Sequence, residues 1–535
     1  MTARAPLPLW AALLVGATAG LSLVLAFPNE LIPVGLWPFA FVAPAGTLLA
    51  LQGRRLGTGA LVGFVTCVAF YLPHISWMTE FLRVPGAEWV PWVALTVFVG
   101  LFWAVGAALI TGAYRWIPRA LPGRPVRLVV VPIVVAGLWT GREALISVFP
   151  YGGFAWGRVG LSQGTGPFRE LYSWLGVSGM TFLCILAAAI FLAAAQEGLR
   201  NSRGAALRTG AVLACALAVL AILPAWPNAV TGSLRVAAVQ GNGKTAYFDP
   251  PDRVGDNLLA QARATEPAYD EDVDVVVWPE GGTDLDPQRS PAAALVFDEI
   301  SEQAGAPLVS GTITTRVPVG GDAANDMEYF NTAIVWRAGA GAGDYYDKRH
   351  PVPFGEYVPD RAVWRQFAPE LIDLIGRDYT PGTTDAVLEL DDGVLAGAAI
   401  CFDIVDDQLM HEIVAEGGQL ILAPTNNGDF GESIESVQQL EIARVRALET
   451  GRTVVNISTV GTSAIILASG SELDRLPRFE AGLMIEDVPL SDTVTPAMSL
   501  GRWIEWGVAM LGLIGVAVGA VLSVRRPRVE NDAPV

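Results

Sequence analysis

Three residues of complementary chemistry could meet at strand ends: Glu280 and Cys401 follow apolar strand-like runs, and Lys348 comes after another strand and a loop. A free thiol has a pKa of about 8.5, so a cysteine nucleophile needs a base to take its proton, and Glu280 could be that base. The ammonium of Lys348 could stabilise the oxyanion that forms when the thiolate attacks an ester or amide carbonyl. The three residues together predict acyl transfer through a thioester.

Cys401 ends the apolar run Val394–Ile400, and a chain reversal and an expected helix follow it. We expect the thiol to stand clear of the sheet beside a helix N-terminus, an environment that favours the thiolate. Cys401 is the only cysteine between residues 232 and 500, so no disulfide can form within that region. The alternative is ordinary: a cysteine after an apolar strand is commonly inert core, and a strand-end Glu or a lone Lys is commonly solvated.

The elements that must position these residues alternate between short β-rich runs and helix-like stretches, which is typical of an α/β domain. Gly/Asp-rich segments at Val319–Asp326 and Ala338–Asp344 are expected to be loops. The expected strands are Leu234–Gln240, Val273–Trp278, Pro307–Thr312, Asn331–Trp336, Val394–Ile400, Gln419–Ala423, Thr453–Ser458 and Thr462–Leu467. The expected helices are Asp252–Ala264, Pro291–Ala304, Asp406–Glu416 and Glu432–Glu449.

The remainder of the chain is too apolar for an ordinary soluble protein. Of 535 residues, 52% are hydrophobic and only 16% are charged, and the mean hydropathy is +0.43. Because a membrane helix needs about 20 apolar residues, we expect eight spans. The first is expected to be a span and not a cleaved signal peptide, because further spans follow at once. The expected spans are 8–27, 31–51, 57–77, 89–111, 126–146, 171–195, 206–225 and 502–523.

Charge divides the chain in the same way. Residues 232–500 contain 44 acidic and 17 basic residues, whereas the rest contains 9 acidic and 18 basic residues, so nucleic acid is not expected as a partner. Arginines gather in alternate loops, which by the positive-inside rule places both termini in the cytoplasm. We therefore expect a membrane part at 1–231, an extracytoplasmic catalytic domain at 232–500, a last span at 501–525 and a cytoplasmic tail at 526–535.

Two loops on the expected outer side are rich in aromatic residues and glycine. One holds Trp77, with Trp89 close behind it, and the other is Phe149–Trp156. They could form the aromatic belt found at membrane surfaces. They could equally form a lipid-binding floor under the active site.

Taken together, these features resemble the Glu-Lys-Cys nitrilase superfamily and, with the membrane spans, its apolipoprotein N-acyltransferase family. The resemblance covers nearly the whole chain. Its motifs are Pro150–Trp156, Val239–Asn242, Trp278–Glu280, Tyr346–Lys348 with Pro353–Pro359, Cys401 and Ala443–Glu449. The resemblance implies an α/β nitrilase-like domain, a four-layer αββα sandwich, inserted between spans 7 and 8 of an eight-helix transmembrane bundle of the bacterial inner membrane.

The resemblance also implies a reaction. Cys401 would accept a fatty acyl chain from a phospholipid and pass it to the α-amino group of the N-terminal diacylglyceryl-cysteine of an apolipoprotein. Glu280 would act as base and acid, Lys348 and the backbone N–H of Phe402 would stabilise the oxyanion, and Glu356 would support Lys348. Asp403 would lie behind them. Aromatic residues that would contact the substrates are Trp77, Trp156, Phe248, Phe354, Tyr357 and Phe430. No metal or cofactor is implied, and the protein is expected to be a monomer.

The sequence departs from the family pattern at Pro351, Asp403 and Asp429, where Leu, Glu and an aromatic residue are usual, and Phe248 stands where a tryptophan is expected. Two other functions stay open. A membrane-tethered amidase would resolve the thioester with water, and a degenerate scaffold would bind lipoproteins without chemistry. A complete set of Glu280, Lys348 and Cys401 argues against the scaffold.

Overall fold

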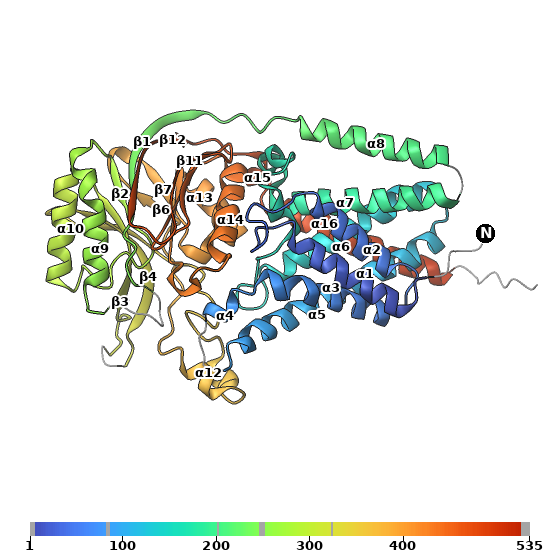
Figure 1. Cartoon of the computed structure of the whole chain (residues 1–535), viewed down its shortest axis with the longest axis horizontal. Helices are drawn as coiled ribbons and strands as arrows, with labels where there is room; N and C mark the ends of the chain where they lie inside the picture. Colours follow the sequence, from blue (N-terminus) through green and yellow to red (C-terminus); the bar gives the residue numbers. More distant parts are fainter. Residues whose placement is uncertain (1–5, 82–85, 201–202, 246–251, 323–324, 526–535) are drawn as a thin grey trace, which may run out of the picture.

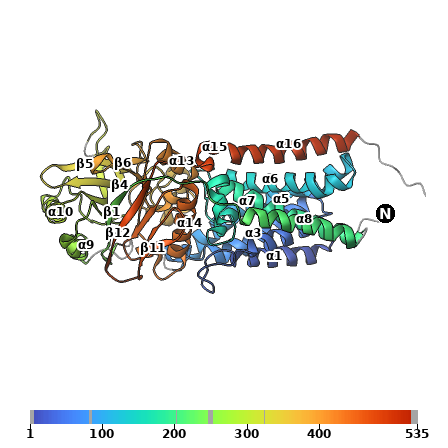
Figure 2. The ribbon, with the colours of Figure 1, turned by 90° about the horizontal axis from the view of Figure 1, so that it is seen from above.

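The computed structural model describes residues 6–81, 86–200, 203–245, 252–322 and 325–525. The molecule is elongated, with a bundle of helices at one end and a helix-covered pair of sheets at the other (Figures 1 and 2).

Long helices of the bundle come from both ends of the chain. They are α1 (Leu9–Val24), α2 (Phe39–Leu51), α3 (Leu56–His74), α5 (Trp89–Ala120), α6 (Val131–Ile146), α7 (Tyr172–Arg200), α8 (Arg203–Ala221) and α16 (Trp503–Arg525). Among the described residues, five apolar helical segments are long enough to cross a membrane, and three shorter apolar helices lie at Leu9–Val24, Phe39–Leu51 and Leu207–Ala221. A helix therefore overlaps each of the eight expected spans.

Small residues allow the bundle helices to approach closely. Where α6 crosses α16, a Cβ atom added to Gly137 or to Gly512 would overlap the backbone of the other helix. Such small-residue crossings are a common way for apolar helices to gain van der Waals contact inside a membrane.

The other end contains two six-stranded sheets, with strand orders β12-β1-β2-β3-β4-β5 and β11-β10-β9-β8-β7-β6. The first sheet is built from β1 (Val230–Gln240), β2 (Val275–Val277), β3 (Leu308–Arg316), β4 (Glu328–Arg337), β5 (Gly341–Asp347) and β12 (Gly482–Ser491). The second is built from β6 (Val387–Glu389), β7 (Leu395–Ala398), β8 (Leu420–Thr425), β9 (Val454–Ser458), β10 (Ser463–Ile466) and β11 (Glu472–Leu476). Strands β1–β3 and β7–β9 run parallel within their sheets, and the outer pairs are antiparallel.

Helices cover both outer faces of the paired sheets, which gives the layer order α, β, β, α. Helices α9 (Asp256–Thr265) and α10 (Pro291–Ala304) cover the first sheet, at the end of the molecule farthest from the bundle (Figure 1). Helices α13 (Asp407–Ala415) and α14 (Glu435–Thr450) cover the second sheet, and α14 lies between that sheet and α7 of the bundle. Short helical segments are α4 (Met78–Phe81), α11 (Arg361–Trp364), α12 (Pro369–Asp373) and α15 (Pro496–Leu500).

Buried apolar side chains form two main cores. One lies between the first sheet and its helices and includes Trp278, Phe297 and Trp336. The other extends from the space between the sheets, through the second sheet and α14, into the bundle. The second sheet and the bundle thus share one core, which packs the space between the sheets against the apolar helices.

All eight expected strands and all four expected helices are confirmed within a few residues. Four strands were not predicted: β5, β6, β11 and β12. The prediction that residues 338–344 form a loop is wrong in part, because β5 begins at Gly341. Strand β5 is an edge strand whose residues 342–345 are exposed, so it has no apolar pattern, and β6 has only three residues.

Candidate active site

Three strands carry the expected chemical residues to one place between the sheets. Glu280 follows β2 of the first sheet, Lys348 follows β5 of the same sheet, and Cys401 follows β7 of the second sheet. The backbone N–H of Lys348 donates to the carbonyl of Asn331 in β4 at 2.7 Å, which fixes where the lysine leaves the sheet.

Lys348 is held between two carboxylates. Its Nζ lies 2.8 Å from Glu356 Oε2 and 3.6 Å from Glu280 Oε1, and the residue is 1% exposed. The Nδ2 of Asn331 donates to Glu280 Oε1 at 2.6 Å and to Glu356 Oε1 at 2.9 Å, and so ties the two carboxyl groups together. The backbone N–H of Asn426 donates to the other oxygen of Glu280 at 2.8 Å.

This arrangement sets the charges of the site. Burial acts to lower the pKa of Lys348, but the carboxylates of Glu356 and Glu280 outweigh it and raise that pKa well above its usual value. The lysine is therefore an ammonium. Burial, which Lys348 only partly offsets, raises the pKa of Glu280 and makes it a stronger base than an ordinary carboxylate.

Cys401 begins a tight turn and not an α-helix. Residues Cys401–Val405 form a 3₁₀ turn, and Cys401 itself has φ +52°, a left-handed conformation that a residue with a Cβ seldom adopts. The turn places the thiol beside Glu280, close enough for the charge of that carboxylate to act on it. Helix α13 begins only at Asp407, and its N-cap Asp406 accepts from the N–H of Leu409.

The expectation that this position favours the thiolate is therefore wrong. Burial, followed by the negative charge of Glu280, raises the pKa of the Cys401 thiol. The physical reason is that the thiol is buried beside a carboxylate, at a 3₁₀ turn and not at the start of an α-helix. The thiol is protonated at neutral pH, so deprotonation by a base becomes a requirement of any nucleophilic attack.

Asp403 anchors the turn from behind. It is fully buried, and its carboxylate accepts from the Tyr346 hydroxyl at 2.9 Å and from the backbone N–H groups of Ile400 and His350 at 3.3 Å. Burial raises the pKa of Asp403 to about 6. Asp403 therefore ties the residue just before Cys401 to β5 and the segment that follows it.

Comparison with known proteins places this geometry in a family. Residues 19–190 match the family described as the apolipoprotein N-acyltransferase N-terminal domain, and residues 235–495 match the carbon-nitrogen hydrolase family. A protein of Mycolicibacterium smegmatis named apolipoprotein N-acyltransferase is 31% identical over 93% of this chain and 83% of its own. The chain belongs to the apolipoprotein N-acyltransferase family.

A second relative of that name, from Azotobacter vinelandii, is 29% identical over 98% of this chain and 97% of its own. Among solved structures, an amidase from Nesterenkonia sp. AN1 is 18% identical, with a TM-score of 0.37, and covers 49% of this chain and 94% of that one. Family membership rests on these sequence relatives, and the chain is therefore an acyltransferase. Its apolar helices are suited to a membrane.

In this apolipoprotein N-acyltransferase family member, aromatic side chains connect the turn at Cys401 to the bundle. The ring of Phe402 stacks on Trp156 at 6.2 Å, Trp156 meets Trp77 edge-on at 5.4 Å, and Trp77 meets Phe430 at 5.4 Å. Trp77 and Trp156 are buried, and the indole N–H of each donates to Gln438 Oε1 of α14. They therefore do not belong to an exposed aromatic belt, whereas Trp89 is 55% exposed.

The remaining expected substrate contacts lie apart from this stack or outside the described residues. Phe354 is half-buried, meets Tyr151 of the bundle loop edge-on at 6.3 Å and donates its N–H to the carbonyl of Tyr357. Phe248 lies outside the residues that the structure describes. Contact of any of these residues with a substrate stays a prediction.

Four polar residues of the site were not predicted: Asn331, Asn426, Glu435 and Gln439. In the sequence, Asn331 is only the start of an expected strand. An amide at a strand end that faces the sheet interior is a signal that could have indicated a site residue. Glu435 and Gln439 lie in a helix whose alternating polar and apolar residues suggest a solvated face, so the sequence pattern concealed them.

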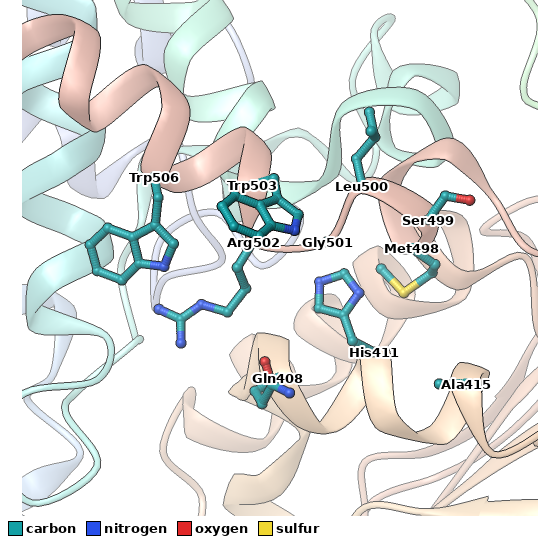
Figure 3. A pocket seen from close by; sticks show the side chains of 10 residues that line it. All are labelled: Gln408, His411, Ala415, Met498, Ser499, Leu500, Gly501, Arg502, Trp503 and Trp506. Atoms are coloured by element: carbon teal, nitrogen blue, oxygen red, sulfur yellow. The ribbon is translucent and has the colours of Figure 1, made fainter.

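A pocket of about 380 Å³ lies where α13 meets α15 and the start of α16, and none of the three catalytic candidates lines it (Figure 3). His411 and Gln408 line it from α13, Trp503 and Trp506 line it from α16, and Arg502 lines it from the turn just before α16. Arg502 is paired with Glu505 at 2.8 Å, so its charge is already balanced.

Proposed function

We propose that this chain transfers an acyl chain from a membrane phospholipid, through a thioester on Cys401, to the α-amino group of a diacylglyceryl-cysteine at an apolipoprotein N-terminus. One observation supports this most: a buried ammonium, Lys348, shares a site with a protonated thiol and a carboxylate of raised pKa. An aromatic stack joins the site to apolar helices. Both substrates are held in a membrane, so a site joined to membrane helices avoids exposing acyl chains to water at about 0.8 kcal/mol per CH₂.

In the first half-reaction, Glu280 takes the proton of the Cys401 thiol while the sulfur attacks the ester carbonyl of the phospholipid. The Nζ of Lys348 and the backbone N–H of Phe402 stabilise the negative charge that develops on the carbonyl oxygen. The carbon–oxygen bond of the ester then breaks, and Glu280 returns the proton to the departing alkoxide. The products are a lysophospholipid and the acylated cysteine.

In the second half-reaction, the neutral α-amino group of the apolipoprotein attacks the thioester. Glu280 takes a proton from the attacking nitrogen, the carbon–sulfur bond breaks, and the thiolate that leaves regains a proton from Glu280. Glu356 acts throughout by holding Lys348 in place, because it is the closer of the two carboxylates to Nζ. The chemistry as written requires neither a metal nor a cofactor.

We further propose that eight helices cross the bacterial inner membrane, with both termini in the cytoplasm. Under this proposal residues 1–231 form the membrane part, 232–500 an extracytoplasmic nitrilase-like domain inserted between spans 7 and 8, 501–525 the last span, and 526–535 a cytoplasmic tail. The alternation of arginine-rich loops supports this orientation. We propose that the protein acts as a monomer.

The test is transfer in a purified system. The full-length protein in phospholipid nanodiscs is incubated with a synthetic peptide whose N-terminal cysteine carries a diacylglyceryl group, and the products are identified by mass spectrometry. We expect N-acylated peptide and lysophospholipid in equal amounts, none of either with Cys401→Ala, and unchanged amounts with Cys215→Ala, which alters an exposed cysteine of the bundle. Free fatty acid in place of acylated peptide would contradict the proposal and favour an amidase-like hydrolysis.

A further inference from the structure

Helix α14 brings a side-chain amide, that of Gln439, to the Cys401 sulfur, in addition to Glu280 and Lys348. The Nε2 of Gln439 lies 3.6 Å from the Sγ of Cys401, an ordinary donor distance for an atom as large as sulfur. Gln439 is 2% exposed and belongs to the helix that separates the second sheet from the bundle, whereas Glu280 and Lys348 come from the first sheet. The sulfur therefore has a donor on a third element of the fold.

A chain of buried hydrogen bonds fixes the orientation of that amide. Gln439 Oε1 accepts from Thr425 Oγ1 and from Asn427 Nδ2, each at 2.9 Å. The Nδ2 of Asn427 also donates to Glu435 Oε2 at 2.8 Å, and its Oδ1 accepts from Ser458 Oγ at 2.7 Å. All five side chains are buried.

Rotating the Gln439 amide by half a turn would place its NH₂ group against the NH₂ group of Asn427. It would also turn an oxygen toward the sulfur. A buried donor that faces another donor costs about 1–3 kcal/mol, so the amide keeps its N–H toward Cys401.

The sulfur carries negative charge at different stages of the two half-reactions. In the first half-reaction, the negative charge at the barrier to alkoxide departure lies on oxygen. Lys348 and the Phe402 N–H face that oxygen. In the second, the bond that breaks is carbon–sulfur, and the charge moves onto Sγ. A donor aimed at Sγ therefore stabilises the second transition state more than the first.

We infer that Gln439 is a catalytic residue of the second half-reaction, whose N–H stabilises the Cys401 thiolate as the amine displaces it, and that Asn427 and Glu435 position it. This inference rests on the proposed thioester mechanism. Under this inference the two donors act at different atoms. Lys348 stabilises negative charge on oxygen, and Gln439, on the bundle-facing side of the nucleophile, stabilises negative charge on sulfur.

The experiment follows both steps by intact mass of the full-length protein in detergent. Dipalmitoyl phosphatidylethanolamine is added first and the acylated protein is timed, then the diacylglyceryl peptide is added and loss of the acyl mass is timed. Gln439→Met keeps the length of the side chain and removes the donor. We expect acylation within about twofold of the parent and deacylation slowed about 10-fold or more, as for loss of a charge-assisted hydrogen bond.

Gln261→Met is the matched control, because Gln261 is an equally buried helix glutamine whose amide donates to the backbone carbonyl of Val239 and not to Cys401, and both its rates should equal those of the parent. Should Gln439→Met fail to fold, Gln439→Glu keeps an acceptor toward Thr425 and Asn427. Its deacylation should slow further as the pH rises, because its carboxyl then loses the one proton that it could share with sulfur.

The outcomes separate the two ideas. A parent protein that never gains the acyl mass overturns the proposed function and this inference with it. A parent that acylates and transfers normally, beside a Gln439→Met protein with both rates unchanged or both slowed equally, overturns the inference alone and leaves the proposed function standing.

Discussion

The two helical layers of the sandwich bury different kinds of side chain. Helix α10, on the outer layer, buries five of its fourteen residues, and these are mostly apolar. Helix α14, on the layer that faces the bundle, buries fourteen of its sixteen residues, including Glu435, Gln439, Arg446 and Glu449. A helix that serves only as a cover can keep a polar face in water, whereas a helix packed on both sides must pair every polar group it carries.

The buried charges of α14 connect the bundle to the nucleophile turn. Arg446 donates to the carbonyls of Ile404 and Val405 at 2.8 and 2.7 Å and pairs with Asp407 and Glu449. Asp407 in turn pairs with Arg158 of the bundle loop at 2.6 Å. The polar side chains of this layer thus hold the turn that begins at Cys401, and those of the outer layer do not.

The largest effect on this contrast is expected from replacing the buried arginine of α14, Arg446. Arg446→Met removes the ionic partner of Glu449 Oε2, one of the two arginines that pair with Asp407, and the donor to two carbonyls, so we expect a loss of about 3–5 kcal/mol in unfolding free energy and little remaining transfer. Arg263→Met, on the exposed face of α9, should change stability by no more than about 0.5 kcal/mol. Equal unfolding midpoints for the two proteins in denaturant titrations would remove the contrast.

The two lysines of the chain give the next largest effect. Lys348→Ala removes the proposed oxyanion donor, and we expect acyl transfer to fall about 10²- to 10³-fold. Lys244→Ala, which alters the chain's other lysine, at a half-exposed position, should leave the initial rate within about twofold. A Lys348→Ala protein that forms the acyl-enzyme at the parental rate would show that the ammonium is only structural.

A pH-dependent difference should also distinguish the layers. Burial raises the pKa of Glu435 to about 8 from an ordinary value of 4.5. As the pH rises from about 4.5 to 8, the unfolded chain releases this proton while the folded chain keeps it, so stability should fall. We expect thermal unfolding midpoints to drop less between pH 5.5 and 8.5 in Glu435→Gln than in the parent.

Glu302→Gln, at an exposed position of α10, is the control for that measurement and should keep the parental slope. Parallel slopes for the parent and Glu435→Gln would mean that this carboxyl titrates as it does in the unfolded chain.

The smallest expected effect belongs to the outer layer. Phe297 packs edge-on against Trp278 and Trp336 at 5.5 and 5.6 Å, in the core between the first sheet and its helices. Phe297→Leu should cost about 1–1.5 kcal/mol in chemical denaturation and leave transfer per folded molecule unchanged. A loss of activity without a loss of stability would show that the outer layer also tunes the site.

The same contrast explains what the sequence could predict. Glu280 and Cys401 follow apolar strands, and strand ends gather at sheet edges, so their meeting with Lys348 could be predicted, although β5, the exposed strand directly before Lys348, could not. Strand β12 could not, because its partner β1 is distant in sequence and its side chains are only partly buried. The polar residues of α14 were misleading for a related reason: a pattern typical of a solvated helix is buried here by a bundle whose contacts only the structure shows.

A covalent bond between Cys401 and a phospholipid acyl group is the central step of the proposed mechanism. The most direct measurement is the intact mass of the full-length protein after incubation with dipalmitoyl phosphatidylethanolamine, followed by peptide mapping and treatment with neutral hydroxylamine. We predict one palmitoyl group per chain, on the peptide that contains Cys401, removed by hydroxylamine as a thioester should be. An unmodified mass, an acyl group on another residue, or a bond that resists hydroxylamine would contradict the account.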